Sequence, residues 1–133
     1  MAFMAKLIHQ MIRVLNPDVA IAFYCEAFGL QESHRLDFPD FTLIYLREPE
    51  SGFEIELTWN KGRTEPYMHG SAYGHIAFAT TALDSCRDRL QRLGFTPGEI
   101  RTLSAPSGSA RFFFVTDPDG YKIEVLERGG HYV

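Results

Sequence analysis

The chain has 133 residues, which is the size of one ordinary domain or of two very small modules. Its 45% hydrophobic and 23% charged residues exclude a disordered chain, and a net charge of −4 without a long Lys/Arg cluster argues against a nucleic-acid partner. Residues 1–11 hold no sustained apolar run, so we expect neither a signal peptide nor a membrane span. Cys25 and Cys86 fall in helical patterns, which predicts reduced, packed thiols and a cytoplasmic location.

The first half of the chain predicts a strand, a helix and three further strands. Alternation along the first strand places His9 and Arg13 on one face. Asn16 suits a helix N-cap, Pro17 the first helical position and Gly29 the helix end. The residues that follow at helical spacing are Ile21, Tyr24, Cys25 and Phe28. The strands are predicted near residues 6–14, 32–38, 41–47 and 53–60.

A polar loop at residues 61–72 leads into a second half with the same order of elements. Thr80 or Thr81 is expected to cap its helix and Gly94 to end it. A tight turn of sequence Asp-Pro-Asp-Gly at 117–120 joins the last two strands. The tail after residue 127 is expected to fray. One helix face collects Leu83, Cys86, Leu90 and Leu93, and strands are predicted near 73–80, 96–102, 110–116 and 121–127.

Three separated landmarks support an internal repeat of about 65 residues. His9 lies 66 positions before His75, and Gly29 lies 65 positions before Gly94. Glu56 and Glu124 lie 68 positions apart in the similar strand sequences FEIEL and YKIEV. We therefore predict an α+β fold of two tandem βαβββ modules, about 1–66 and 67–133, within one domain.

Each module carries one histidine on its first strand and one glutamate on its last. If those strands are neighbours, His9 can meet Glu56 and His75 can meet Glu124. If the modules then pair, two imidazoles and two carboxylates with room for two waters form an octahedral site for Ni²⁺, Co²⁺, Mn²⁺ or Fe²⁺. A single strand histidine or glutamate is more often a solvated or packed residue, and the repeat is what favours a metal site.

Other candidate groups fit solvated or packing roles better. His34, His69 and His131 fall in loops, at strand ends or in the tail, and we interpret them as solvated. Ser107 and Ser109 belong to a flexible turn without a neighbouring base, and Cys86 on a helix face is more typical of packing than of a nucleophile.

The chain resembles glyoxalase I (lactoylglutathione lyase) of the vicinal oxygen chelate superfamily. The segments that carry the resemblance occur in family order across almost the whole chain, and ELTWN with YGHI is the most specific combination. They are IHQMIRV, ELTWN followed by GRTEPY, YGHIAF, and DPDGYKIEVLE.

The resemblance implies that the two modules curl into a metal-holding cup. Within a homodimer, His9 and Glu56 of one chain would join His75 and Glu124 of the other around one ion. The short chain is similar to the class that prefers Ni²⁺ or Co²⁺, with Zn²⁺ as a further candidate. The implied reaction isomerises the hemithioacetal of methylglyoxal and glutathione to S-lactoylglutathione through an enediolate. Glu124 would be the base, and Glu56 is the second candidate.

The implied substrate contacts are Arg13, which matches a family arginine for a glutathione carboxylate, and Asn60 at the end of ELTWN. Residues 104–109 depart from the family pattern, because they lack the lysine that commonly holds the glycine carboxylate. Either Arg111 replaces this lysine or the chain uses a different thiol.

Two other classes of function stay open at this point. One is another metalloenzyme of the same fold, such as an acyl-CoA epimerase, a thiol transferase or a ring-cleaving dioxygenase, although a second glutamate argues against the dioxygenase triad. The other is a binding protein without catalysis. Neither class implies a membrane or a nucleic acid as a partner.

Overall fold

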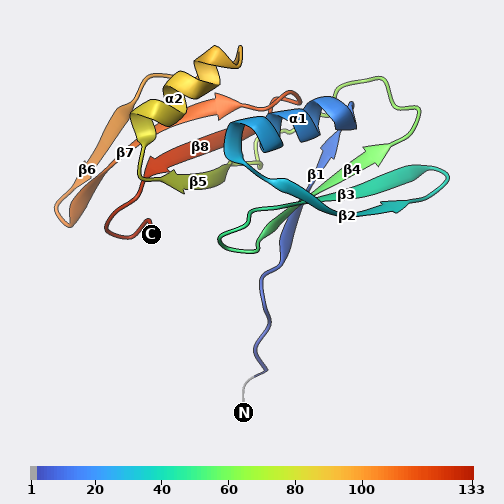
Figure 1. The fold of residues 1–133 in the computed structure, drawn as a ribbon, viewed down its shortest axis with the longest axis horizontal. Coiled ribbons are helices and arrows are strands. Elements are labelled where there is room, and N and C mark those ends of the chain that lie inside the picture. Colours follow the sequence, from blue (N-terminus) through green and yellow to red (C-terminus); the bar gives the residue numbers. More distant parts are fainter. Residues whose placement is uncertain (1–2) are drawn as a thin grey trace. The chain divides into compact units, whose positions relative to one another are not determined.

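The computed structural model describes residues 3–133, which form two compact units that divide between Tyr67 and Met68 (Figure 1). Each unit is a β-α-β-β-β module, so the predicted α+β class with two tandem modules is confirmed. The first unit contains β1 (His9–Val14), α1 (Pro17–Phe28), β2 (Gln31–Asp37), β3 (Phe41–Arg47) and β4 (Glu54–Asn60). The second contains β5 (Ile76–Thr80), α2 (Leu83–Arg92), β6 (Arg101–Ala105), β7 (Gly108–Thr116) and β8 (Lys122–Glu127).

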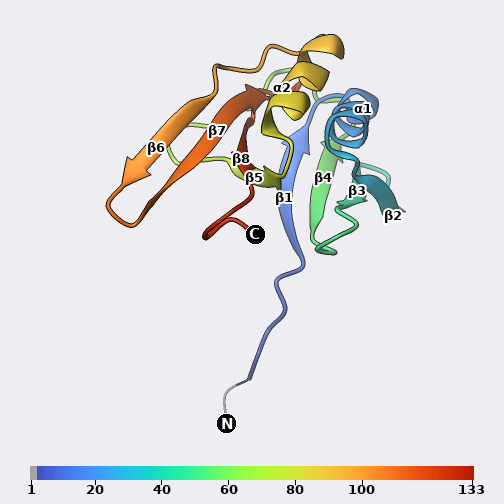
Figure 2. The same ribbon diagram turned by 60° about the vertical axis from the view of Figure 1, so that its left-hand side comes forward.

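The first unit is a mixed four-stranded sheet with the order β1-β4-β3-β2. The first strand, β1, therefore pairs in parallel with the last strand, β4, and α1 connects β1 to β2. Alternate residues of β1, β3 and β4 are buried, among them Ile12, Ile44 and Leu57, whereas β2 is exposed throughout. Figure 2 shows α1 beside this sheet. The residues between the buried ones point to the other face of the sheet, which can therefore carry polar side chains.

The start and end of α1 follow the predicted capping residues. Asn16 accepts hydrogen bonds from the backbone N–H groups of Asp18 and Val19, Pro17 opens the helix, and Gly29 ends it in the left-handed conformation at φ 72°. Of the four residues noted at helical spacing, Tyr24 is buried and the other three are half-buried. This helix is apolar nearly all round, so several stripes fit helical spacing. The buried residues are Ala20, Phe23, Tyr24 and Ala27.

The second unit repeats the topology with the sheet order β5-β8-β7-β6, and β5 again runs parallel to β8. The predicted turn at 117–120 is confirmed. Asp117 Oδ1 accepts hydrogen bonds from the backbone N–H groups of Asp119 and Tyr121, both at 2.9 Å. The Asp117 side chain thus organises the turn that sets the start of β8.

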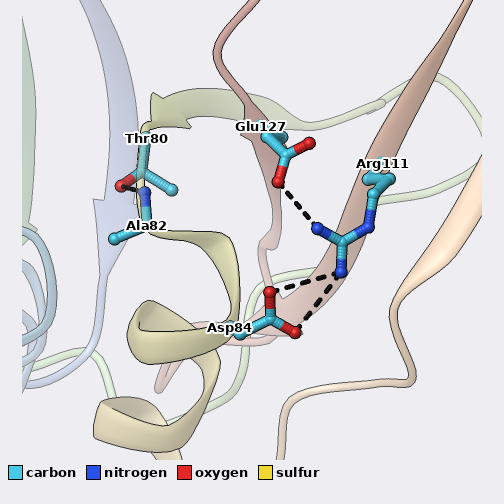
Figure 3. A network of polar contacts seen from close by, with 5 residues as sticks. All are labelled: Thr80, Ala82, Asp84, Arg111 and Glu127. Carbon is cyan, nitrogen blue, oxygen red and sulfur yellow. Dashed lines mark hydrogen bonds and ion pairs between the residues drawn. The ribbon is translucent and has the colours of Figure 1, made fainter.

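The predicted threonine cap of α2 is wrong by one position. Thr80 Oγ1 accepts a hydrogen bond of 3.1 Å from the Ala82 N–H (Figure 3), but Ala82 itself is the N-cap and offers no side-chain acceptor. Leu83 and Leu90 are buried as predicted, whereas Cys86 and Leu93 are only half-buried. Within residues 3–133, neither helix combines the length and hydropathy that a membrane crossing requires.

The strand predicted at 96–102 is displaced to β6, which forms a hairpin with β7. Arg87 donates hydrogen bonds to the carbonyl oxygens of Pro97 and Gly98, so its side chain occupies acceptors that a strand would use. Pro97 also has no N–H to donate. Ser107 lies in the turn between β6 and β7, as predicted, whereas Ser109 belongs to β7 and pairs with Ser104.

The parallel pairs begin later than predicted. β4 begins at Glu54 and β8 at Lys122, so the residues before His9 and Ile76 lack a neighbouring strand to pair with. Just before β1, the backbone N–H of Glu54 still donates a hydrogen bond of 3.0 Å to the carbonyl oxygen of Ile8. His75, which the sequence predicts inside the strand near 73–80, therefore precedes β5. The predicted fraying of the tail is also wrong, because Gly129 forms a β-bridge with Tyr132.

Candidate active site

The first His–Glu pair meets inside the first unit. His9 stands opposite Glu54 in the parallel register, and its side chain reaches diagonally to Glu56, two residues further along β4. His9 Nε2 lies 3.7 Å from Glu56 Oε2. The neighbours of Glu56 along the strand, Ile55 and Leu57, are buried, so alternation turns the carboxylate to the other face.

The second pair meets in the same way inside the second unit. His75 lies one residue before Ile76, which pairs with Ile123, and His75 Nε2 lies 3.2 Å from Glu124 Oε1. The two carboxylates are similarly shielded, with side-chain exposures of 13% for Glu56 and 17% for Glu124. Each module therefore presents one imidazole and one carboxylate that face each other.

An aromatic ring stands beside each pair. Tyr45 on β3 is the cross-strand partner of Glu56, and its ring meets His9 edge-on at 5.7 Å between centroids. Phe114 on β7 is the cross-strand partner of Glu124, and its ring meets His75 edge-on at 5.4 Å. The Tyr45 hydroxyl donates a hydrogen bond to Glu56 Oε2, and this bond, followed by burial, raises the pKa of Tyr45 to about 12. Neither ring was singled out from the sequence.

The donor atoms of the two pairs fit a divalent cation of the first transition row. Imidazole nitrogen suits Ni²⁺, Co²⁺, Fe²⁺ and Zn²⁺, and a carboxylate oxygen next to it suits an ion of intermediate hardness. Within each unit, the described residues bring together two such side chains, and no group of three or more His, Cys, Asp or Glu residues gathers among residues 3–133. Each pair is thus half of the predicted four-ligand set.

The two predicted substrate residues lie on the first sheet. Arg13 is exposed on β1, with the same alternation as His9, and pairs in register with Thr58. Asn60 is the last residue of β4, and its Nδ2 donates a hydrogen bond of 2.9 Å to the Tyr67 hydroxyl. Arg63 stacks on the same Tyr67 ring at 3.9 Å, so the loop that follows β4 is tied back to Asn60.

Arg111 does not fit the role of a replacement for the missing lysine. Its guanidinium donates to Glu127 at 2.7 Å and to both carboxylate oxygens of Asp84 at 3.3 Å (Figure 3). These acidic partners, Asp84 first, raise the pKa of Arg111. Arg111 therefore links α2 to β8, and its charge is already matched by two carboxylates.

Two hollows flank Phe114 within the second unit. One has a volume of about 260 Å³ and is lined by residues that include Phe114 and Lys122. The other, of about 350 Å³, includes Phe114 and the exposed Arg101. Apolar hollows whose lining includes a basic residue suit an organic anion.

One of the remaining histidines differs from the prediction. His34 and His131 are exposed as predicted, but His69 is half-buried and stacks on Tyr121 at 4.1 Å with the ring planes only 9° apart. Cys25 and Cys86 are free, half-buried thiols, and burial raises the pKa of each. Both cysteines thus contribute partly to the packing of their helices, which is less burial than the packed thiols expected from the sequence.

The comparisons with known proteins agree with this topology. Residues 6–125 match the family model of the Glyoxalase/Bleomycin resistance protein/Dioxygenase superfamily. The lactoylglutathione lyase of Haemophilus influenzae is 37% identical over 128 residues, which are 92% of each chain. The lactoylglutathione lyase of Salmonella typhimurium is 36% identical, again over 92% of each chain.

Solved structures lead to the same family. A trypanothione-dependent glyoxalase I from Leishmania major superposes with a TM-score of 0.76 at 34% identity, covering 93% of this chain and 87% of that one. Glyoxalase I from Zea mays superposes with a TM-score of 0.80 at 29% identity, over 94% of this chain and 45% of that longer one. The chain therefore belongs to the lactoylglutathione lyase (glyoxalase I) family of the Glyoxalase/Bleomycin resistance protein/Dioxygenase superfamily.

Proposed function

We propose that this protein is a divalent-metal-dependent lactoylglutathione lyase that converts the hemithioacetal of methylglyoxal and glutathione into S-lactoylglutathione. The observation that carries the proposal is the pair of matching His–Glu contacts, one in each module, at 3.7 Å and 3.2 Å. Relatives named lactoylglutathione lyase, at 36–37% identity over most of the chain, support the same reaction.

The proposed metal ligands are His9, Glu56, His75 and Glu124. Ni²⁺ or Co²⁺ is the proposed ion, with Zn²⁺ as the alternative, because two nitrogen and two oxygen donors suit six-coordinate ions of this series. We further propose a homodimer in which each site takes one His–Glu pair from either chain. A cytoplasmic location agrees with two free thiols and with glutathione as the co-substrate.

The reaction moves one proton between neighbouring carbons and leaves the elemental composition unchanged. The Glu124 carboxylate removes the proton from the carbon that carries sulfur. The C–H electron pair becomes the C=C bond, and the π pair of the neighbouring carbonyl moves onto its oxygen to give the enediolate. Glu124 returns this proton to the second carbon, while the hydroxyl proton passes from the first oxygen to the second. When bound at the two His–Glu pairs, a divalent cation would supply positive charge where the two vicinal oxygens become negative.

Other residues bind and orient the thiol part of the substrate. Arg13 is proposed to pair with one glutathione carboxylate, and Asn60 to hydrogen-bond the peptide. Because Arg111 is matched by Asp84 and Glu127, the exposed Arg101 beside the Phe114 hollow is the better candidate for a second carboxylate. The thiol itself needs a direct test, since the similar Leishmania major enzyme is described as trypanothione-dependent.

The test is turnover by protein stripped with a chelator and then reloaded with Ni²⁺, Co²⁺, Mn²⁺ or Zn²⁺. Methylglyoxal adducts of glutathione, trypanothione and coenzyme A are compared at equal concentration, and thioester formation is followed. We expect turnover of the glutathione adduct only after metal loading, highest with Ni²⁺ or Co²⁺. Inactivity with every metal and every thiol would refute the proposed function.

A further inference from the structure

The rings beside the two His–Glu pairs differ in that one is a tyrosine and the other a phenylalanine. Tyr45 and Phe114 hold equivalent places, each opposite the glutamate of its module and each with its ring edge-on to the histidine. The centroid distances, 5.7 Å and 5.4 Å, and the interplanar angles, 69° and 76°, are closely matched. The main difference between these rings is therefore the Tyr45 hydroxyl.

This hydroxyl gives Glu56 a partner that Glu124 lacks. Tyr45 donates to Glu56 Oε2, the same oxygen that faces His9. Within the described part of the chain, residues 3–133, His75 is the one polar side chain that contacts the Glu124 carboxylate. Exposure does not separate the two glutamates, at 13% and 17%, so the hydrogen bond is the feature that does.

A fixed carboxylate and a movable one suit different tasks. A hydrogen bond from a rigid phenol restricts the side-chain rotamers of Glu56 and holds its oxygen towards the imidazole of His9. A base that carries a proton from one carbon to the next must swing between positions, and each anchoring bond adds to the cost of that movement. Phe114 offers Glu124 only an apolar ring.

We propose that Tyr45 is a positioning residue that holds Glu56 as a permanent metal ligand, while Phe114 leaves Glu124 free to move as the base. This inference rests on the proposed lyase function and explains, from this chain's own residues, why two similar carboxylates have different roles. Tyr45 acts through Glu56 and does not itself touch the reacting atoms.

The test exchanges one oxygen atom at each position, with Tyr45→Phe and Phe114→Tyr. Ni²⁺ affinity is measured by competition with a chelator, and kcat and KM are measured at saturating Ni²⁺. Tyr45→Phe should weaken Ni²⁺ binding by about tenfold or more, with kcat of the loaded enzyme kept within about twofold. Phe114→Tyr should lower kcat by about tenfold or more and leave Ni²⁺ affinity equal or tighter, because the new hydroxyl anchors Glu124.

Matched controls remove or add a phenol oxygen at positions away from Glu56 and Glu124. Tyr132→Phe removes a phenol oxygen near the C-terminus, and Phe38→Tyr adds one at a surface ring stacked on Phe41. Both should keep the wild-type Ni²⁺ affinity and kcat. Circular dichroism and thermal unfolding check that all four variants are folded.

Unchanged Ni²⁺ affinity in folded Tyr45→Phe, or unchanged kcat in folded Phe114→Tyr, would overturn the proposal. The double variant Tyr45→Phe/Phe114→Tyr gives an independent reading, because it moves the anchor from Glu56 to Glu124. In that background Glu56→Gln should become the more damaging glutamate substitution for kcat. If the wild-type protein had no lyase turnover, the proposed function would fail, but the Ni²⁺-affinity comparison would still decide whether Tyr45 anchors Glu56.

Discussion

The Nε2 atom of His75 lies 3.2 Å from Oε1 of Glu124, although His75 precedes its strand and Glu124 lies at the far end of the module. The parallel pairing of β5 with β8 produces this contact, because it brings the first and last strands of the module side by side. The same pairing of β1 with β4 places His9 beside Glu56. The parallel pairing of the first and last strands in each module thus produces both halves of the candidate metal site.

Replacement of Glu124 by Gln should abolish most turnover without unfolding the protein. The amide keeps the size of the side chain but cannot accept the substrate proton, and general-base catalysis typically contributes about 10²–10⁴-fold. We expect a kcat loss in this range at saturating Ni²⁺. Glu56→Gln should act mainly on Ni²⁺ affinity, and a turnover of Glu124→Gln equal to wild type would show that Glu124 is not the base.

Mixed dimers test whether the two half-sites come from different chains. The variant His9→Ala/Glu56→Ala lacks the first half-site, and His75→Ala/Glu124→Ala lacks the second, so each should be inactive alone. After subunit exchange, half of the dimers are mixed and each has one intact site, which predicts recovery of about a quarter of the wild-type activity.

The control for this experiment mixes two variants that both lack the second half-site, and it should recover no activity. Exchange itself is followed by mass differences between tagged chains. If exchange is complete and activity stays absent in the first mixture, both half-sites of one ion belong to the same chain, and the proposed inter-subunit arrangement is wrong.

Arg13→Ala should raise KM for the glutathione adduct by about tenfold or more and change kcat by less than about twofold. Arg13 is proposed to bind a carboxylate that does not react, so its contribution is the same in the ground state and the transition state. Ni²⁺ affinity serves as the control and should stay at the wild-type value. A large fall in kcat with KM unchanged would instead place Arg13 near the reacting carbons.

The stability of the first unit should depend on pH through Asp37. Asp37 Oδ1 accepts hydrogen bonds from Lys61 at 2.7 Å and from Thr42 at 2.6 Å, and Lys61 first, then Thr42, lower the pKa of this carboxyl. Because the pKa of Asp37 is lowered in the folded state, its ionised carboxylate stabilises the fold at pH values above the ordinary pKa of about 3.9. This contribution is lost as the pH falls through the lowered pKa.

Asp37→Asn should therefore melt below the wild type at pH 7, and the difference should shrink as the pH falls below about 4. The ion pair is exposed, so the effect should be small and should decrease with added salt. Lys61→Met should show the same trend. A difference in melting temperature that grows towards low pH would contradict this interpretation.

The module repeat and both His–Glu pairs could be predicted because they depend on strong local signals. The capping residues Asn16 and Gly29 predicted where α1 begins and ends, and strand alternation placed Glu56 and Glu124 on the polar face. The buried face of α1, which includes Phe23 and Tyr24, could not be predicted, because an almost wholly apolar helix carries no clear stripe.

Other features depend on contacts between residues distant in sequence. Arg87 engages the Pro97 and Gly98 carbonyls and so displaces the strand predicted there, and His69 stacks on Tyr121. Tyr45 was missed although a signal existed. Alignment of the two modules on Glu56 and Glu124 would have matched Tyr45 with Phe114 to within one position and exposed the extra hydroxyl.

The most direct test of the account is a Ni²⁺ titration of the chelator-stripped protein, with thioester formation from the methylglyoxal–glutathione adduct as the readout. We predict no turnover before metal is added, a linear rise, and a plateau at one Ni²⁺ per chain, with Glu124→Gln binding the same amount of Ni²⁺ but remaining nearly inactive. Full turnover in the stripped protein, or no turnover with any divalent ion, would contradict a metal-dependent lyase built from two His–Glu pairs.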